Sequence, residues 1–333
     1  KVDGSAAGNG GAGIEIGGTL TGILIGSDTS GAGNIISSNT DAGISNTAST
    51  ASGMIIKGNI VGLGSDGASI RGNGGAGIYI TSSNNTIGST NANGRNTISS
   101  NGTDGVRIDG TDITGNTILG NYIGLSSDGL YDFGNTVNGV HVSNGADNTI
   151  IGGSAVGAYN VISGNTINGI RVTGTGTTST SILMNYIGLS KNGNIAIPND
   201  QNGIKIDGGS SGTSVGSVSV SGTNVISGNL NNGILIDGSN SNTIVANRIG
   251  IDTSSAIDFD NPSSNADLGN TLDGISLLNG SSSNVIGSAT STTLANVFGF
   301  NVYGVSVDGA SASLNTIRFN RFLISDTASI TLT

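Results

Sequence analysis

Cysteine and tryptophan are absent from this sequence of 333 residues, and proline occurs only twice. The absence of cysteine fits an exported product that avoids thiol chemistry, although many cytosolic proteins lack cysteine as well. Without tryptophan, and with few other aromatic residues, the chain offers few platforms on which a sugar ring can stack. Together with the 59 glycines, these absences argue against the core of an ordinary globular enzyme.

Basic residues are also few. The chain has 11 Lys and Arg and 21 Asp and Glu, which gives a net charge of −10. This balance disfavours nucleic acid and anionic membranes as partners, because binding phosphate groups requires clustered positive charge. No apolar run approaches the length of about 18 residues that a membrane span needs. No charged and apolar leader precedes Lys1, so a secreted protein would be present in mature or excerpted form.

What the sequence does contain is a repeat, and residues 105–138 show it. Three short β-type pieces in this stretch are separated by Gly and Asn, where the chain turns: 106–108, 117–118 and 122–123. Side chains alternate along each piece, so Ile108 is expected to point inward and Arg107 outward. One unit cannot bury its apolar side chains alone, whereas stacked units pair their strands at a spacing of about 4.8 Å.

The repeat runs through the whole chain. Aligning the sequence on Gly-[Ile/Val]-x-[Ile/Val/Leu] places the starts of ten rungs at Gly13, Gly43, Gly77, Gly105, Gly139, Gly169, Gly203, Gly233, Gly274 and Gly304. Short and long rungs alternate, which makes a two-rung super-repeat of about 64 residues. We therefore predict an all-β solenoid, a parallel β-helix with three short strands per rung and almost no helix. Residues 1–333 form a single domain, with a partial rung at 1–12 and ten rungs at 13–333.

Asparagine recurs at the turns in the same phase, at Asn96, Asn160 and Asn224 for example. It suits left-handed backbone conformations, and its amide can hydrogen-bond from rung to rung in ladders.

The rung NGIRVTG…NYIGLSKNG and its partner NVISGNTINGI resemble the repeats of large secreted bacterial surface proteins, within the pectate-lyase-like and NosD-like β-helix group. The resemblance covers essentially the whole chain and implies a right-handed parallel β-helix. It does not imply one activity, because this group includes polysaccharide lyases and hydrolases, tailspikes, adhesins and passive rods.

The strongest functional signal lies in the outward residues of the first strand piece, taken rung by rung. Consecutive rungs carry the column Tyr79, Arg107, His141, Arg171 and Lys205. Because the chain has only 11 Lys and Arg, this column is a candidate surface for binding an anionic polysaccharide. The alternative is that Asp109, Asp207 and Asp237 neutralise the column in weak surface ion pairs. His141 by itself is more often an exposed bystander than a catalyst.

The catalytic motifs of β-helix enzymes are missing. A lyase needs a Lys or Arg base and several carboxylates that hold Ca²⁺. Asp207 and Asp237 can face each other across adjacent rungs, with Lys205 beside them, but no third carboxylate is adjacent. The sequence also lacks Asp-Asp and Gly-His-Gly, the paired-acid motifs of β-helix glycosidases. We therefore predict that the protein is not an enzyme and requires no cofactor.

The longest insertion, residues 252–273, is a weak calcium candidate because clustered carboxylate oxygens suit a hard cation. Its candidate ligands are Asp252, Asp258, Asp260 and Asp267. Their spacing matches no EF-hand, and a solvated acidic loop is the favoured interpretation.

Both ends of the chain fall within a long-rung insertion, and neither shows a helix or charged cap over its outermost strands. We therefore predict head-to-tail stacking into a filament or a longer fibre, with Ser329, Ile330, Thr331 and Leu332 as the junction strand. The favoured function is an extracellular structural or adhesive element of the cell surface whose partner is itself. The alternative is a polysaccharide-binding or polysaccharide-degrading protein, a lyase or hydrolase, acting along the Tyr79–Lys205 face on cell-surface glycans.

Overall fold

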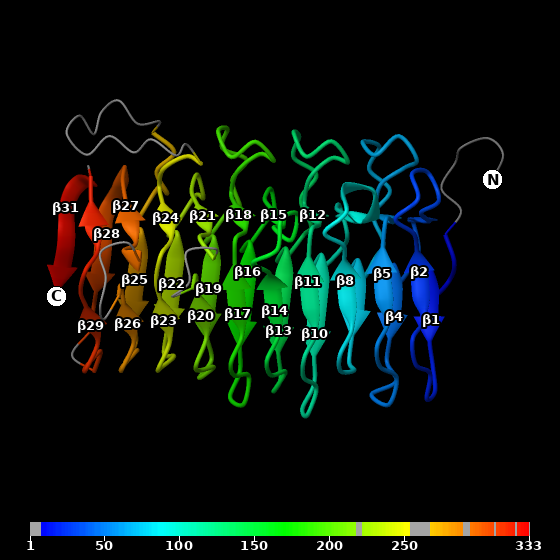
Figure 1. Cartoon of the computed structure of the whole chain (residues 1–333), viewed down its shortest axis with the longest axis horizontal. Helices are drawn as coiled ribbons and strands as arrows, with labels where there is room; N and C mark the ends of the chain where they lie inside the picture. The colour runs from blue at the N-terminus through cyan, green and yellow to red at the C-terminus, as the bar shows by residue number, and fades with distance from the viewer. Residues whose placement is uncertain are drawn as a thin grey trace.

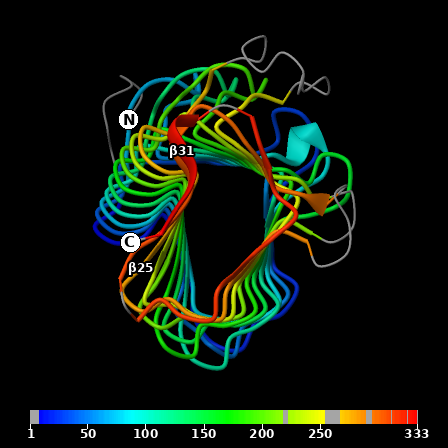
Figure 2. The same cartoon turned by 90° about the vertical axis from the view of Figure 1, so that its left-hand side faces the viewer.

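The chain folds into a right-handed parallel β-helix with three strands in each rung. The computed structural model describes residues 8–217, 222–253, 267–288, 294–309, 311–323 and 325–332. Every third strand belongs to the same sheet, so three parallel sheets of 11, 10 and 10 strands run side by side along the axis (Figure 1). Viewed along the axis, successive rungs superpose closely, and the loops project at the corners (Figure 2).

The strands are short in all three sheets. The first sheet contains β1 (Ile14–Ile16), β4 (Ile44–Asn46), β7 (Ile78–Ile80), β10 (Val106–Asp109), β13 (Val140–Ser143), β16 (Ile170–Thr173), β19 (Ile204–Asp207), β22 (Ile234–Asp237), β25 (Ile275–Leu278), β28 (Asn301–Val307) and β31 (Ser325–Leu332). The second contains β2 (Leu24–Gly26), β5 (Ile55–Lys57), β8 (Thr86–Gly88), β11 (Thr117–Leu119), β14 (Ile150–Gly152), β17 (Ser181–Leu183), β20 (Ser214–Val215), β23 (Thr243–Ile244), β26 (Val285–Ile286) and β29 (Thr316–Ile317). The third contains β3 (Ile35–Ile36), β6 (Ile60–Val61), β9 (Thr97–Ile98), β12 (Tyr122–Ile123), β15 (Val161–Ile162), β18 (Tyr186–Ile187), β21 (Val225–Ile226), β24 (Arg248–Ile249), β27 (Val297–Phe298) and β30 (Arg321–Phe322).

The predicted near-absence of helix is confirmed over the described residues, where the helical structure is one 3₁₀ turn, η1 (Ala92–Gly94). The same residues contain no helix whose length and apolar character would allow it to cross a membrane.

The core is built from the alternation seen in the sequence. Val106 pairs in register with Ile78 and Val140, and Ile108 pairs with Ile80 and Val142. All six of these side chains are fully buried. Burying one such aliphatic side chain contributes about 1.5–3 kcal/mol, and the short strands supply these residues in continuous inward columns.

Glycine begins each rung because the neighbouring rung leaves no room for a side chain. At Gly139, a Cβ atom would lie 2.5 Å from Ile162 Cγ2 and 2.6 Å from the carbonyl oxygen of Gly169. Both distances are shorter than van der Waals contact, so a larger residue would push the rungs apart. The glycine phase in the sequence therefore fixes where each rung enters the first sheet.

The predicted asparagine ladders are present at both corners of the third sheet. In each ladder, the side-chain amide of one rung donates a hydrogen bond to the side-chain oxygen of the next. Before the third sheet, the ladder comprises Asn34, Asn59, Asn96, Asn121, Asn160, Asn185, Asn224, Asn247, Asn296 and Asn320. After it, the ladder comprises Asn9, Asn39, Asn73, Asn101, Asn135, Asn165, Asn199, Asn229, Asn270 and Asn301.

Two rows of loops flank the third sheet. Short rungs have their insertion before a third-sheet strand, as at 89–95, and long rungs have theirs after it, as at 126–138. The long-rung loops stack on one another, because Ser127 N donates to Gly67 O at 3.0 Å and Lys191 N donates to Gly129 O at 3.0 Å. These loops project along one side of the solenoid in Figure 1.

Candidate functional site

The five residues of the predicted column lie next to one another on the outer face of the first sheet. Arg107 pairs in register with Tyr79 on one side and His141 on the other, and Arg171 pairs with His141 and Lys205. Parallel strands are about 4.8 Å apart, so the column extends over roughly 20 Å of the axis. We call this set the basic column. The sequence predicts this geometry, because residues at the same position in successive repeats become neighbours when the rungs stack.

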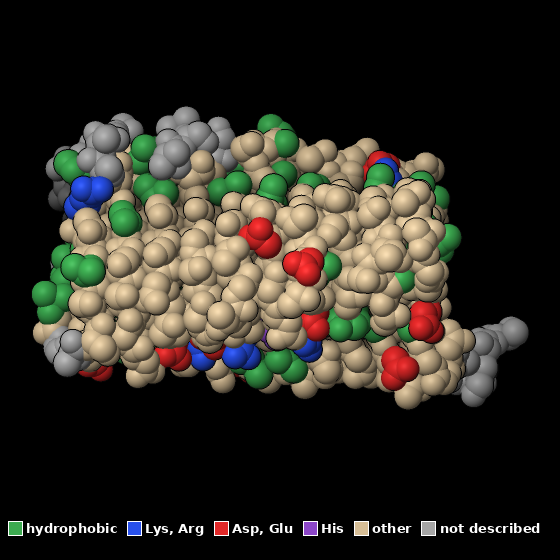
Figure 3. All heavy atoms as spheres, turned by 90° about the horizontal axis from the view of Figure 1, so that it is seen from below, with side chains coloured by type: hydrophobic (Ala, Val, Ile, Leu, Met, Phe, Trp, Pro, Cys, Tyr) green, Lys and Arg blue, Asp and Glu red, His purple; other side chains and the backbone are tan. Residues whose placement is uncertain are grey.

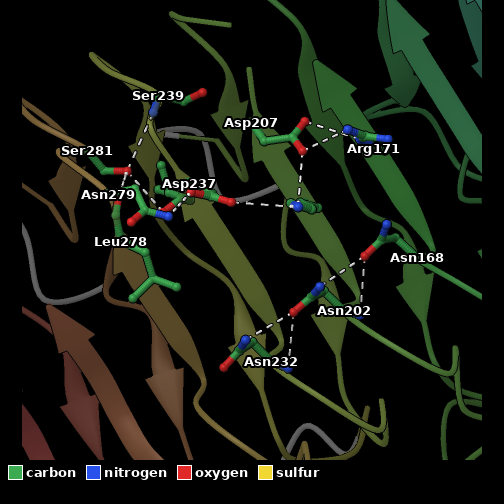
Figure 4. A network of polar contacts seen from close by, with 12 residues as sticks. Asn168, Arg171, Asn202, Asp207, Asn232, Asp237, Ser239, Leu278, Asn279 and Ser281 are labelled. Carbon is green, nitrogen blue, oxygen red and sulfur yellow. Dashed lines mark hydrogen bonds and ion pairs between the residues drawn. The ribbon is translucent and has the colours of Figure 1, made fainter. Parts of the chain in front are cut away.

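Carboxylates accompany the cations of the basic column, as the ion-pair alternative anticipated. Asp207 binds Arg171 Nη2 at 2.9 Å and Lys205 Nζ at 3.1 Å, and Asp237 lies 3.7 Å from Lys205 Nζ (Figure 4). Arg107 Nη2 lies 3.3 Å from Asp109. From below, most of the surface is neither charged nor apolar, and Lys and Arg side chains gather near one edge beside carboxylates (Figure 3).

His141 is buried, so its interpretation as an exposed bystander is wrong. Only 9% of the residue is exposed, and its Nδ1 lies 3.0 Å from Asp104 Oδ2. The other oxygen of Asp104 accepts hydrogen bonds from the side chain of Asn138 at 2.8 Å and its backbone N–H at 3.1 Å. Within the described part of the chain, the buried Nε2 atom of His141 has no hydrogen-bond partner. An ionised Asp104 selects the tautomer with the proton on Nδ1, which leaves Nε2 as a proton acceptor.

The environment of Asp104 favours this ionised form. Burial acts most strongly and would raise the pKa of Asp104, but the interactions with His141 and the hydrogen bonds from Asn138 together lower it. A carboxylate that accepts several hydrogen bonds keeps its charge despite losing water. Asp104 and His141 therefore form a carboxylate–imidazole pair of the kind that orients a general base.

Asp109 contacts the side chains at the Tyr79 end of the basic column. It accepts hydrogen bonds from the Tyr79 hydroxyl at 3.1 Å and from Asn144 Nδ2 at 2.7 Å, and the Arg107 guanidinium lies 5.8 Å from the Tyr79 ring centroid. Burial acts to raise the pKa of Asp109, but the hydrogen bond from Ser143 and the charge of Arg107 lower it. Burial and the nearby Asp109 charge raise the pKa of Tyr79. Tyr79 is thus held as a neutral phenol with a fixed ring.

A shallow hollow of about 420 Å³ adjoins Tyr79 and Arg107. It exists because the residue immediately before the rung glycine is small in the first three rungs: Ala12, Ala42 and Ala76. Later rungs have larger polar residues at this position, namely Asp104, Asn138, Asn168, Asn202 and Asn232. These later residues form a further ladder beside the basic column, part of which is visible in Figure 4.

Sequence reasoning missed Asp104 and this ladder. The available signal was the residue preceding each rung glycine, which changes from Ala to Asp and Asn between the rung of Tyr79 and that of Arg107. The contact itself joins different rungs, because Asp104 precedes β10 and His141 lies on β13. Reading only the outward residues of single strands therefore left the imidazole without its partner.

Two of the four calcium candidates, Asp258 and Asp260, lie outside the described residues. Asp267 is exposed and accepts a hydrogen bond from Gly269 N at 3.1 Å, and Asp252 is partly exposed. Among the residues that the structure describes, no group of three or more Asp, Glu, His or Cys side chains is arranged to hold a metal ion. Calcium binding in this insertion stays a prediction.

Residues 329–332 lie in β31, which pairs with β28 through Ile330↔Val305, Thr331↔Ser306 and Leu332↔Val307. The predicted strand is therefore present within the eleven-stranded first sheet. The role of Ser329, Ile330, Thr331 and Leu332 in head-to-tail assembly stays a prediction.

The fold and the site define a right-handed parallel β-helix with a buried carboxylate–histidine pair in a basic column. No protein-family model and no curated protein matches the chain. A solved structure of a mutant of the periplasmic alginate epimerase AlgG has 13% identity and a TM-score of 0.48, over 84% of this chain and 51% of that one. The A-module of mannuronan C-5 epimerase AlgE4 from Azotobacter vinelandii has 16% identity and a TM-score of 0.43, over 98% and 82%. The AlgE6 A-module from the same organism has 14% identity and a TM-score of 0.46, over 98% and 81%.

This chain spans about half the length of the AlgG structure, and the likenesses concern the fold. They nevertheless correct one prediction. We predicted that the protein is not an enzyme because lyase and glycosidase motifs are missing, but the similar β-helix structures are named as epimerases, which are enzymes. The absence of those particular motifs is therefore no reason to exclude catalysis on this fold.

Proposed function

We propose that the protein is a polysaccharide-modifying enzyme that binds an acidic polysaccharide along the basic column. The observation that carries this proposal is the His141–Asp104 pair, whose buried Nε2 atom lies without a partner between two arginine rungs. The expectation of a protein that works outside the cytoplasm is part of the same proposal.

Carboxylate-bearing sugars fit the basic column better than neutral ones. Arg171 binds Asp207 through Nε and Nη2, and a guanidinium has five N–H donors in all, so donors remain for a substrate carboxylate. Arg107 lies on the other side of His141, one rung away at about 4.8 Å. The buried Asp partners, Asp109 and Asp207, hold both guanidinium groups in place, which reduces the entropy lost on binding.

The chemistry that this arrangement supports is removal of the ring proton next to a uronate carboxylate. Once a local movement of the column side chains exposes the buried Nε2 atom of His141, this atom takes the proton from C5. The C5–H electron pair is delocalised into the carboxylate, and an arginine neutralises the charge that develops there. Asp104 keeps the imidazole oriented and stabilises the imidazolium. The carbanion can then take a proton from a water molecule on the opposite face, which inverts C5, and the imidazolium of His141 returns its proton to solvent. Alternatively the carbanion expels the oxygen at C4, which takes the proton from the imidazolium and leaves as an alcohol, so that the chain breaks and a C4–C5 double bond forms. Tyr79, about two rungs from His141, is placed to hold a neighbouring sugar.

The test is incubation of the purified chain in D₂O with mannuronan, alginate and polygalacturonate. Deuterium entering C5, observed by NMR, reports proton abstraction, and unsaturated ends report chain cleavage. We expect one of these signals with the wild-type protein and a rate at least 100-fold lower for His141→Gln. Leu235→Ala, at the rung after Lys205 in the same register, is the matched control and should keep full activity. The proposal is overturned if no acidic polysaccharide reacts, or if His141→Gln retains the wild-type rate.

A further inference from the structure

Three of the six tyrosines of the chain gather on another face of the solenoid, above the third sheet. Tyr122 on β12 and Tyr186 on β18 both pair in register with Val161 on β15, so they are two rungs apart. Tyr159, from the insertion before β15, fills the rung between them. Its ring centroid is 5.1 Å from that of Tyr186, with the planes tilted by 32°.

Arg95 joins these rings into one assembly. Its guanidinium carbon lies 4.1 Å from the Tyr122 ring centroid and 5.5 Å from that of Tyr159, both within cation–π range. Tyr122 is 8% exposed and packs in a small apolar cluster with Leu125 and Val161. It therefore forms the fixed base, whereas Tyr159 and Tyr186 are only partly buried. Tyr159 and Tyr186 pack against the same cluster, but part of each side chain remains at the surface.

A hollow of about 260 Å³ lies against Tyr159 and Tyr186. Its other walls are Met184, Thr223, Val225, Arg248 and Thr253, so two apolar side chains, two hydroxyl-bearing residues and a guanidinium surround the aromatic rings. Burial lowers the pKa of Arg248, and Asp252 acts against this shift. The volume is close to the lower end of the range for small-molecule sites, about 300–1,000 Å³, which suits one ring rather than a large cofactor.

The combination of aromatic rings, hydroxyls and a guanidinium selects the chemistry of the occupant. A pyranose presents C–H groups to an aromatic ring and hydroxyls around its edge, and a carboxylate on that edge suits a guanidinium. A cation is disfavoured by Arg248, and a wholly apolar molecule would leave Thr223 without water, whereas the Thr253 hydroxyl donates to Asn192 O at 3.2 Å.

We propose that this hollow is a second carbohydrate site, which binds one carboxylate-bearing pyranose unit of a glycan. It lies on the third sheet, whereas the basic column lies on the first, and it uses none of the residues proposed for catalysis. Its role is to anchor a glycan chain without acting on it. The existence of this site therefore does not depend on the proposed enzymatic function, and the two can be tested separately.

The experiment is an NMR and calorimetric titration of the full chain with a trimannuronate, compared with neutral mannotriose. Tyr186→Ala should weaken trimannuronate binding at this site about tenfold, whereas Tyr186→Phe should stay within threefold because it keeps the stacking ring. Tyr131→Ala, at a tyrosine that is 64% exposed on a long-rung loop, should leave binding unchanged. Arg171→Ser is expected to weaken binding at the basic column, but the NMR shifts that trimannuronate causes around Tyr159 and Tyr186 should persist in this variant.

Circular dichroism of each variant checks that the fold is intact, and Arg248→Gln provides a second test if Tyr186→Ala does not fold. This second variant should lower trimannuronate affinity and reduce the preference over mannotriose. The proposal is overturned if trimannuronate does not bind, if Tyr186→Ala binds as wild type, or if mannotriose binds as tightly. Loss of all binding in Arg171→Ser would also overturn it, because the basic column would then be the only site.

Discussion

At the scale of the residue, the site depends on carboxylates that are buried and still charged. Asp207 is only 6% exposed, and it binds both Arg171 and Lys205. Burial acts most strongly and would raise the pKa of Asp207, but hydrogen bonds from Arg171, Thr173 and Lys205 lower it. An unpaired buried charge would cost several kcal/mol, so these bonds are what allow Asp207 to remain ionised.

The lowered pKa of Asp207 predicts a pH-dependent effect on stability. Since the folded-state pKa lies below the unfolded value near 3.8, the carboxylate stabilises the fold above that pH and loses this effect as pH falls through the folded value. Asp207→Asn should lower the unfolding free energy by about 1–3 kcal/mol at neutral pH. In urea titrations at successively lower pH, the difference between the two proteins should shrink as the pH falls below the unfolded value. An equal difference at every pH would show that the charge is not the cause.

At the scale of the element, the ladders provide hydrogen-bond partners for the polar groups that are buried at the corners of the solenoid. The ladders beside the third sheet are continuous, but the one before the second sheet is interrupted. Asn116 accepts from Asn85 at one end and Asn242 donates to Asn284 at the other. The intervening rungs have threonines whose buried hydroxyls have no partner among the described contacts: Thr149, Thr180 and Thr213. Buried polar groups without partners reduce stability, so this corner is a weak point of the stack.

Repairing the interruption should stabilise the protein. Thr213 N already donates to Asn242 Oδ1 at 2.9 Å, so in Thr213→Asn the new amide can also donate to that oxygen. Thr and Asn have similar volumes, and we expect a gain of about 1 kcal/mol. The measurement is the urea midpoint, with Thr166→Asn at an exposed turn as the control. A lower midpoint for Thr213→Asn would mean that the corner cannot hold an amide there.

At the scale of the whole molecule, the solenoid is one-dimensional, because the strands of each rung pair only with those of its two neighbours, and the long-rung loops reach no further than the second neighbour. The hydrophobic core is a single column that follows the axis. Damage to one rung should therefore spread to adjacent rungs before it reaches distant ones. A compact globular core would instead lose stability everywhere at once.

Hydrogen exchange of Ile108→Asp tests this property. Ile108 is fully buried, so an unpaired carboxylate there should cost roughly 4 kcal/mol or more. Amides of β7, β10 and β13 should lose protection, while those of β22 and β25 should keep it. Arg107→Ser, on the same strand but facing solvent beside Asp109, should cost at most about 1 kcal/mol. Uniform loss of protection along the chain would show that the solenoid unfolds as one unit.

The sequence by itself determined the rungs, the inward columns, the asparagine ladders and the basic column. The reason is that residues of equal phase must become neighbours once identical strands stack in register. Arg107, His141 and Arg171 could therefore be placed in one row without coordinates. The regular recurrence of glycine at the start of each rung also has a steric cause, because adjacent rungs approach each other too closely there for a side chain.

Only the tertiary structure decided the contacts between residues that occupy different positions in the repeat. Asp104 meets His141 from a different position of a different rung, and Tyr159, at the end of the insertion before β15, contacts Tyr186 on strand β18. No periodicity in the sequence aligns such residues, because side-chain direction and loop path depend on how neighbouring rungs fill the corners. The pairing that turns an isolated histidine into a candidate base therefore became visible only in the folded stack.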